Sequence, residues 1–181
     1  VEEDFDGYIA IPEKVHFKCR SYYVTSIGKG AFMGYVNLKK ISLPSTITEI
    51  DDRAFSGCKK LELDNLPGKL SKIGDSAFRS CENLQIKQLP ENLTEICELA
   101  FYDCKKISVN RIPNNVFRIG FGAFENTSIK KIFIPESVRE LGNDAFATSL
   151  IEKITLSGES NLSKFDILNA CGERSVDITK L

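Results

Sequence analysis

The chain has 181 residues, of which 42% are hydrophobic and 27% charged, so it has enough apolar side chains to bury a core. Its formal net charge of −1 argues against a nucleic-acid partner, because nucleic-acid-binding proteins usually carry a strong basic excess. No apolar run approaches the roughly 18 residues of a membrane span, and the single histidine, His16, argues against most hydrolytic triads and zinc sites, so we expect neither an enzyme nor a cofactor.

Residues 1–20 are expected to form N-terminal capping strands. The stretches 8–15 and 22–28 resemble the lead-in of a repeat array, which implies two strands around a turn that cover its first unit. The chain begins at Val1 without an initiator Met, a basic n-region or an apolar h-region. Removal of a leader and trimming of the chain are the two explanations, and the sequence does not distinguish them.

An Ala-Phe pair recurs along most of the chain. Its phenylalanines are separated by 23 residues four times and then by 22, which chance does not produce. The six pairs are Ala31-Phe32, Ala54-Phe55, Ala77-Phe78, Ala100-Phe101, Ala123-Phe124 and Ala145-Phe146. An internal repeat of this length is typical of solenoids and related arrays.

Each unit has the same order of apolar, proline and acidic positions. An aliphatic residue stands five residues before each Phe, as Ile50 does before Phe55, and from the second unit onward a proline stands eleven before it, as Pro44 does. Alternating stretches such as 132–134 precede the proline and predict a short strand, which proline ends because it has no N–H. Acidic residues just before Ala-Phe, such as Asp52, predict one or two turns of α or 3-10 helix.

A unit of this size cannot bury its apolar side alone, whereas stacked units can. We expect residues 21–157 to form a single array of six coils, with the strands joined into one parallel sheet and the phenylalanines into an internal column. Neighbouring strands lie about 4.8 Å apart, so six coils would span about 25–30 Å.

Two positions depart from a strict repeat. Glycine follows the aliphatic residue in four units, but Asp51 and Cys97 stand there in the others, so this position does not need a positive φ in every coil. In the second to fourth units the middle apolar residue of the strand stretch has moved by one place, as at Leu63 and Ile86. Which side chains face outward in those coils stays open.

Residues 158–181 do not continue the repeat and are expected to form a C-terminal cap. Leu162, Phe165 and Leu168 have helical spacing, and Gly172 is a typical helix stop. The stretch 175–179 predicts one last strand. Atypical ends are expected of an array, because its terminal coils have to be covered.

The pattern L-x-x-I-x-L-P-x-x-[LIV]-x-x-I-G-x-x-A-F-x-x-C, repeated six times over about residues 21–157, resembles the BspA-like class of bacterial-type leucine-rich repeats. The resemblance implies an α/β leucine-rich repeat solenoid, a right-handed β–α superhelix with one parallel sheet and short helical or 3-10 segments on its convex side. It also implies a secreted or cell-surface protein that binds other molecules and has no catalytic activity.

Three cysteines, Cys58, Cys81 and Cys104, stand three residues after a repeat Phe and should form a column in adjacent coils. They predict a ladder of small buried side chains, the usual role of a free cysteine. An inter-coil disulfide or a metal site are the alternatives. Parallel side chains on neighbouring coils do not bring their Cβ atoms to the ~3.8 Å that a disulfide needs.

The outward strand positions suggest a binding face. They comprise seven basic and three acidic residues, or +4, on a chain whose total is −1. These residues are Lys39, Lys40, Glu62, Asp64, Lys87, Arg111, Lys130, Lys131, Glu152 and Lys153. Phe133 lies among the lysines, either as an exposed anchor or as local packing. We therefore expect contacts from Phe133, Lys131, Lys153, Arg111 and Lys40.

The function that these patterns favour is a non-catalytic, adhesin-like binding module outside the cell. Its sheet face would recognise a protein or a glycan, and its basic character favours an anionic one. The alternative is a structural spacer or assembly element of a larger envelope complex. A spacer should carry unremarkable outward positions, whereas a binding module should gather aromatic residues and one sign of charge.

Overall fold

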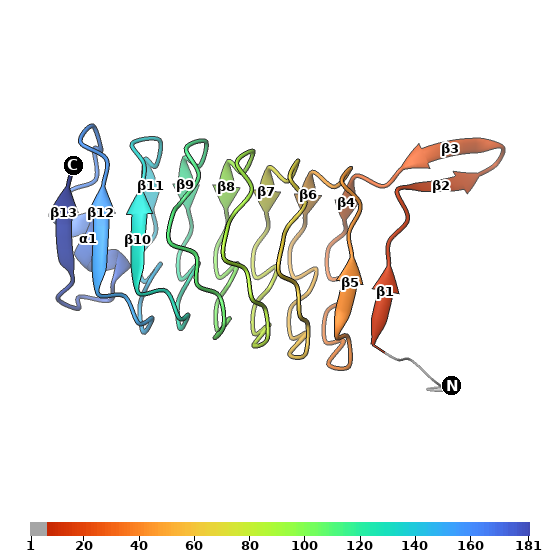
Figure 1. The fold of residues 1–181 in the computed structure, drawn as a ribbon, viewed down its shortest axis with the longest axis horizontal. Coiled ribbons are helices and arrows are strands. Elements are labelled where there is room, and N and C mark those ends of the chain that lie inside the picture. Colours follow the sequence, from red (N-terminus) through yellow and green to blue (C-terminus); the bar gives the residue numbers. More distant parts are fainter. Residues whose placement is uncertain (1–6) are drawn as a thin grey trace.

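The computed structural model of the chain describes residues 7–181, so the first six residues of the expected N-terminal cap lie outside the described part. The chain winds into a stack of coils, with β1 (Tyr8–Ala10) at one end and β13 (Asp177–Lys180) at the other (Figure 1). Short strands of successive coils align along two sides of this stack. The six repeat coils are followed by one further turn through α1 (Lys164–Ala170) and β13.

One side of the stack is a continuous six-stranded parallel sheet, in the order β11-β9-β8-β7-β6-β4. Each strand has two residues and ends on the aliphatic residue that precedes the Phe by five, as Ile50 pairs with Ile27 and Ile73. The strands are Ser26–Ile27 (β4), Glu49–Ile50 (β6), Lys72–Ile73 (β7), Glu95–Ile96 (β8), Arg118–Ile119 (β9) and Glu140–Leu141 (β11). Beyond the first coil, the sequence predicts strands only before the prolines and none in this segment.

The stretch before each proline, where one continuous sheet was expected, forms two separate short sheets. At one end β1 pairs with β5 (Lys40–Ser42), and at the other β10 (Lys131–Ile134) pairs with β12 (Lys153–Leu156), which pairs with β13. The coils between them contain no strand here, because their middle apolar residue sits one place earlier and the ladder loses its regular register. Single bonds, such as Glu62 N–H to Lys39 O at 2.8 Å, still connect these coils.

The repeat phenylalanines form the expected internal column. Five of them, from Phe55 to Phe146, are fully buried, and neighbouring rings are stacked with centroids 5.3–5.6 Å apart. Phe32, in the first coil, is only partly buried. The column runs through the whole repeat array, so the core is one continuous unit.

The segment around each Phe is a series of turns, and the helical turns expected there are absent from all six coils. The residues two before and two after each Phe have positive φ, which interrupts a right-handed helix. Alternate N–H groups consequently point to the next coil, as from Phe55 to Ala77 O at 2.8 Å, while those between them close turns within the coil, as from Ser56 to Arg53 O at 3.1 Å. Backbone bonds between coils replace the helix.

The two ends of the array differ. At the N-terminus, β2 (Lys14–Phe17) and β3 (Arg20–Tyr23) form an antiparallel hairpin that projects from the stack instead of covering the first coil (Figure 1). At the C-terminus, α1 takes the place of the next Phe turn, since Phe146 N–H donates to Ala170 O at 2.7 Å. The buried residues of α1 are Ile167 and Ala170, whereas Phe165 of the predicted apolar spacing is 69% exposed.

Candidate functional site

The outward charges of the six-stranded sheet neutralise one another. In register, Glu49, Lys72, Glu95, Arg118 and Glu140 alternate in sign along β6 to β11. Lys72 Nζ lies 3.5 Å from a Glu49 oxygen, and Arg118 Nε lies 3.3 Å from one of Glu140. The carboxylate of Glu49 is the main reason why the pKa of Lys72 is raised.

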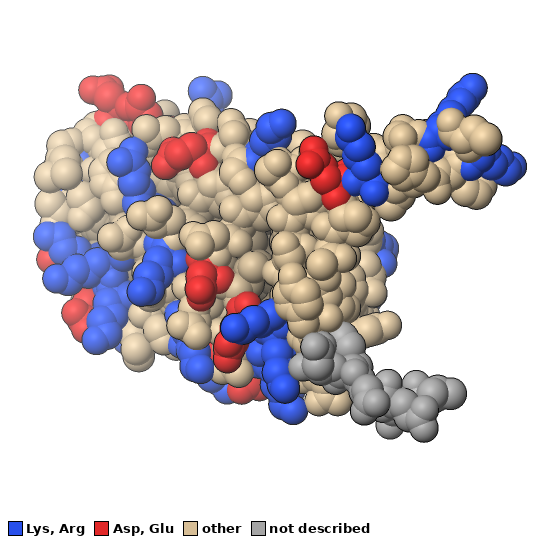
Figure 2. All heavy atoms as spheres, turned by 45° about the vertical axis from the view of Figure 1, so that its right-hand side comes forward, with Lys and Arg blue, Asp and Glu red and all other residues tan. Residues whose placement is uncertain are grey.

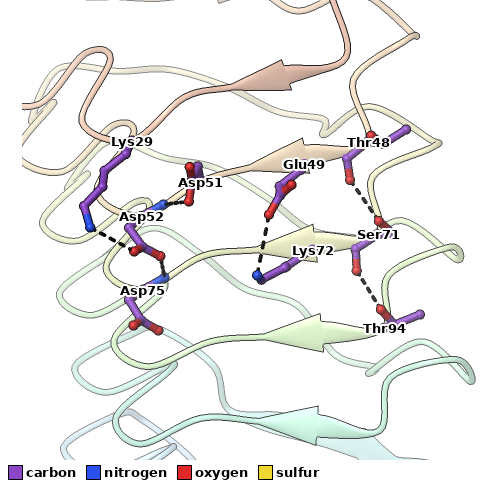
Figure 3. A network of polar contacts seen from close by, with 9 residues as sticks. All are labelled: Lys29, Thr48, Glu49, Asp51, Asp52, Ser71, Lys72, Asp75 and Thr94. Carbon is purple, nitrogen blue, oxygen red and sulfur yellow. Dashed lines mark hydrogen bonds and ion pairs between the residues drawn. The ribbon is translucent and has the colours of Figure 1, made fainter.

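Two ladders of polar side chains flank these charges (Figure 3). The hydroxyl groups of Ser71 and Thr94 each donate to the carbonyl oxygen of the equivalent residue one coil earlier, at 3.0 and 2.9 Å. The carboxylate of Asp52 accepts the N–H of Asp75 at 3.0 Å and lies 3.5 Å from the Lys29 ammonium. On this face the polar side chains therefore bond to neighbouring coils and hold them together.

The opposite line of strands brings four of the five predicted site residues together. Lys131 and Lys153 are register partners on β10 and β12, and Phe133, two residues along β10, forms an isolated bridge with Arg111. The Arg111 guanidinium carbon lies 5.5 Å from the centre of the Phe133 ring. Lys40 is on β5 beside β1, four coils away, which is about 19 Å at the usual strand spacing. It does not join the other four.

The cations around Phe133 are poorly neutralised. Lys131 has no ion pair within residues 7–181, and Lys153 has only a 3.9 Å contact with Asp177, whose side chain is 68% exposed. Arg111 donates to the neutral amide oxygen of Asn114 at 2.8 Å. Phe133 itself is partly buried between the inward Ile132 and Ile134.

Phe133 also separates two shallow hollows. The one we call the corner hollow lies where the chain turns after Pro135, has a volume of about 650 Å³ and includes Arg111 and Arg139 in its lining. The lysine hollow lies over the strands, has a volume of about 460 Å³ and is lined in part by Lys131 and Lys153.

Sequence reasoning did not include Arg139 in the site, although the repeat contains a signal for it. In the first four units the residue seven before the Phe carries a hydroxyl group and extends the ladder described above, as Thr48 and Ser71 do. Phe117 and Arg139 occupy this position in the fifth and sixth units. The ladder thus ends at the coils where the corner hollow lies.

The cysteine column is buried and contains no disulfide. Cys58, Cys81 and Cys104 are free and fully buried, and their sulfur atoms lie 3.0–3.1 Å from the carbonyl oxygen of the Phe one coil earlier. Burial raises the pKa of the Cys58 thiol to about 11 and raises those of Cys81 and Cys104 as well. Thr127, in the same position, donates within its own coil to Phe124 O at 2.8 Å.

Residues 7–181 contain no group of three or more His, Cys, Asp or Glu side chains placed to hold a metal ion. His16 is exposed on β2, away from the cysteine column. No helix in this described part of the chain is both long and apolar enough to cross a membrane.

Coils stacked in register around one column of phenylalanines define a leucine-rich-repeat type of parallel β-solenoid. The sequence profile described as BspA type leucine rich repeat region, in six copies, matches residues 25–152. The chain therefore belongs to the BspA type leucine-rich repeat family.

A solved structure similar to the chain has the same fold. A leucine rich repeat protein of T. pallidum is 28% identical, with a TM-score of 0.69 over 84% of this chain and 74% of its own. A leucine rich cell surface protein of Faecalibacterium prausnitzii is 16% identical, with a TM-score of 0.48 over 96% of this chain and 87% of its own. None of the curated proteins compared with the chain matches it significantly.

Proposed function

We propose that the chain is a non-catalytic binding module and that its contact face is centred on Phe133, Lys131, Lys153 and Arg111. We call these four residues the Phe133 face. Location outside the cell is part of the proposal, because the family resemblance implies it. The ligand is a protein or a glycan with anionic groups.

One observation carries the proposal: charged side chains are paired on one side of the stack and largely unpaired around Phe133 on the other. Along the six-stranded sheet every second strand supplies the opposite charge, as Lys72 does for Glu49, so an approaching ligand meets alternating charges and no block of one sign. Around Phe133, Lys131 has no ion pair within residues 7–181 and Lys153 has only the 3.9 Å contact with the exposed Asp177, and the aromatic side chain between them is partly accessible. Aromatic and arginine residues are frequent in binding hot spots, and unpaired cations attract anionic partners.

The test compares two triple variants against a panel of immobilised extracellular matrix proteins, serum proteins and defined glycans. Phe133→Ala, Lys131→Ala and Lys153→Ala remove the proposed contact. Glu49→Ala, Lys72→Ala and Glu95→Ala change the same number of side chains on the six-stranded sheet and serve as the control. Circular dichroism and thermal melting establish that both variants are folded.

We expect the first triple variant to lose binding to the panel member that wild type binds, and the control to keep it. Equal binding by wild type and both variants would place the contact elsewhere. Binding to no panel member by any of the three would favour the alternative function, a structural spacer.

A further inference from the structure

The surface around Phe133 offers two chemically different compartments that share one wall. Phe133 lines both the corner hollow and the lysine hollow. Lys131 and Phe133 are two residues apart on β10, which corresponds to about 7 Å along a strand. One extended ligand of a few rings can therefore occupy both compartments at once.

The corner hollow is polar without a net charge. It contains the guanidinium groups of Arg111 and Arg139, the carboxylates of Glu136 and Glu159, and the amides of Asn114 and Asn161. Donors and acceptors lie together beside an aromatic wall, which suits adjacent hydroxyl groups of a sugar ring, since each hydroxyl both donates and accepts. An isolated anion gains less here than beside the lysines, because the two carboxylates offset the attraction of the two guanidinium groups.

Ser137 adds an uncommitted hydroxyl group to this hollow. Its Oγ is buried and has no hydrogen-bond partner within the described residues. At the equivalent position of other coils, Asn92 and Asn115 donate to the backbone carbonyl of the preceding coil, at 2.7 and 2.8 Å. This ladder stops at Ser137, and a buried hydroxyl without a partner is costly unless something binds it.

The lysine hollow has the opposite character. Its polar lining consists of Lys131, Lys153, Asn110 and Thr155, without a carboxylate. Lys131 lacks an ion pair in the described chain, and the one contact of Lys153 with Asp177 is long and solvent-exposed. This compartment favours a carboxylate or sulfate group.

We propose that the Phe133 face binds an acidic oligosaccharide in which neutral and acidic sugars alternate. A neutral ring lies in the corner hollow against Phe133, with hydrogen bonds to Arg139 and Asn161 and, after its buried hydroxyl group rotates about χ1, to Ser137. The acidic group of the next ring lies between Lys131 and Lys153. This inference rests on the proposed function and narrows its ligand class.

The experiment measures affinities by isothermal titration calorimetry with four ligands. Hyaluronan hexasaccharide alternates neutral rings with carboxylates, and chondroitin sulfate hexasaccharide adds sulfates. Chitohexaose provides neutral rings only, and polyglutamate provides carboxylates without sugar. The two acidic oligosaccharides should bind, and both should bind more weakly at high salt. Hyaluronan should be the tighter ligand, because the sulfates of chondroitin sulfate charge the amino-sugar ring that lies in the corner hollow.

Variants separate the two compartments. Arg139→Ala with Asn161→Ala should weaken oligosaccharide binding at least about tenfold. Lys131→Ala with Lys153→Ala should weaken it similarly and remove most of its salt dependence. Lys69→Ala with Lys106→Ala removes two exposed lysines from other coils and should leave affinity unchanged.

Several results would overturn the inference. Chitohexaose binding as tightly as the acidic oligosaccharides would exclude an acidic ligand, and polyglutamate binding as tightly would exclude a sugar site. The inference would also be refuted if neither of the two acidic oligosaccharides bound. If the Phe133 triple variant nevertheless loses a protein ligand from the panel, the proposed function stands and only the glycan assignment fails.

Discussion

The cysteine column makes stability depend on pH in a direction that the structure fixes. The folded pKa of Cys58 is about 11, above its ordinary value of 9.0, because burial disfavours the thiolate. The unfolded chain therefore loses its proton first, so this contribution to stability is complete below pH 9 and is lost as the pH rises towards 11. Cys81 and Cys104 act in the same direction.

We expect the urea concentration at the midpoint of unfolding to decrease as the pH is raised from 8.5 to about 11. The triple variant Cys58→Ser, Cys81→Ser, Cys104→Ser should show a smaller decrease. Thiol titration of the native protein at pH 8 should leave the three cysteines unreactive and should detect them after denaturation. A disulfide or bound metal found by mass spectrometry would refute the ladder.

Gly120 shows that glycine in the repeat can serve close packing between coils. Its φ is not positive, but a Cβ atom there would lie 2.6 Å from Glu98 N and 2.7 Å from Cys97 C. Gly120→Ala should cost about 1–3 kcal/mol, as overpacking does. The control is Gly28→Ala in the first coil, where a Cβ would meet nothing within 4 Å. Equal melting temperatures of the two variants would contradict this.

At the scale of elements, the phenylalanine column predicts a gradient of stability. Phe78 is fully buried and stacks on Phe55 and Phe101 at 5.3 and 5.4 Å, so Phe78→Ala should cost about 3–5 kcal/mol. Phe32 is partly buried and has one stacked neighbour, so Phe32→Ala should cost less. Phe146 lies near an end, but α1 covers it, and it is buried like Phe78. Chemical denaturation tests this order, and equal losses for Phe32 and Phe78 would contradict it.

The hairpin of β2 and β3 should be dispensable for the array. All eight of its strand residues are exposed, including Phe17 at 62% and Tyr23 at 57%, and Figure 2 shows only basic charges towards its tip. A two-stranded hairpin with no covered face contributes little to stability. Replacing residues 14–23 by a short Gly-Ser turn should leave the cooperative melt nearly unchanged. A large drop in melting temperature would show that the hairpin supports the first coil.

The sequence predicted the elements that depend on spacing and missed those that depend on backbone geometry. The Phe column and the cysteine ladder follow from residues that recur at a fixed distance, so the repeat alone places them in the core. The turns around each Phe were expected to be helical, because acidic residues before Ala-Phe resemble a helix start. Gly30 and Gly122 at the position two before the Phe are a signal for positive φ, but Arg53 and Leu99 hide it in other coils.

Of the candidate site, the residues on the strands could be predicted from the sequence and those at the corner after Pro135 could not. Alternation along the strand identified Phe133, Lys131 and Lys153 as outward residues. It also included Lys40, because a one-dimensional pattern does not separate the first coil from the fifth. Arg139 and Ser137 come from the corner beyond Pro135, where strand alternation no longer applies, so only the fold brings them to Phe133.

At the scale of the whole molecule, the array presents one structural side and, as we propose, one binding side. The six-stranded sheet is held by alternating charges and by ladders between coils, whereas on the strands at the C-terminal end Lys131 has no ion pair within residues 7–181 and Lys153 has only a long one. Adding or removing a coil in the N-terminal half of the array should leave the Phe133 face intact, because each coil contacts only its neighbours.

Amide hydrogen exchange tests this division most directly. It is measured with and without whichever matrix protein, serum protein or glycan wild type binds most tightly. The bound ligand should slow exchange in residues 129–135 and 151–157 and leave residues 94–97 and 117–120 of the six-stranded sheet unchanged. Slowed exchange confined to the six-stranded sheet or to the hairpin would contradict the assignment of the binding face.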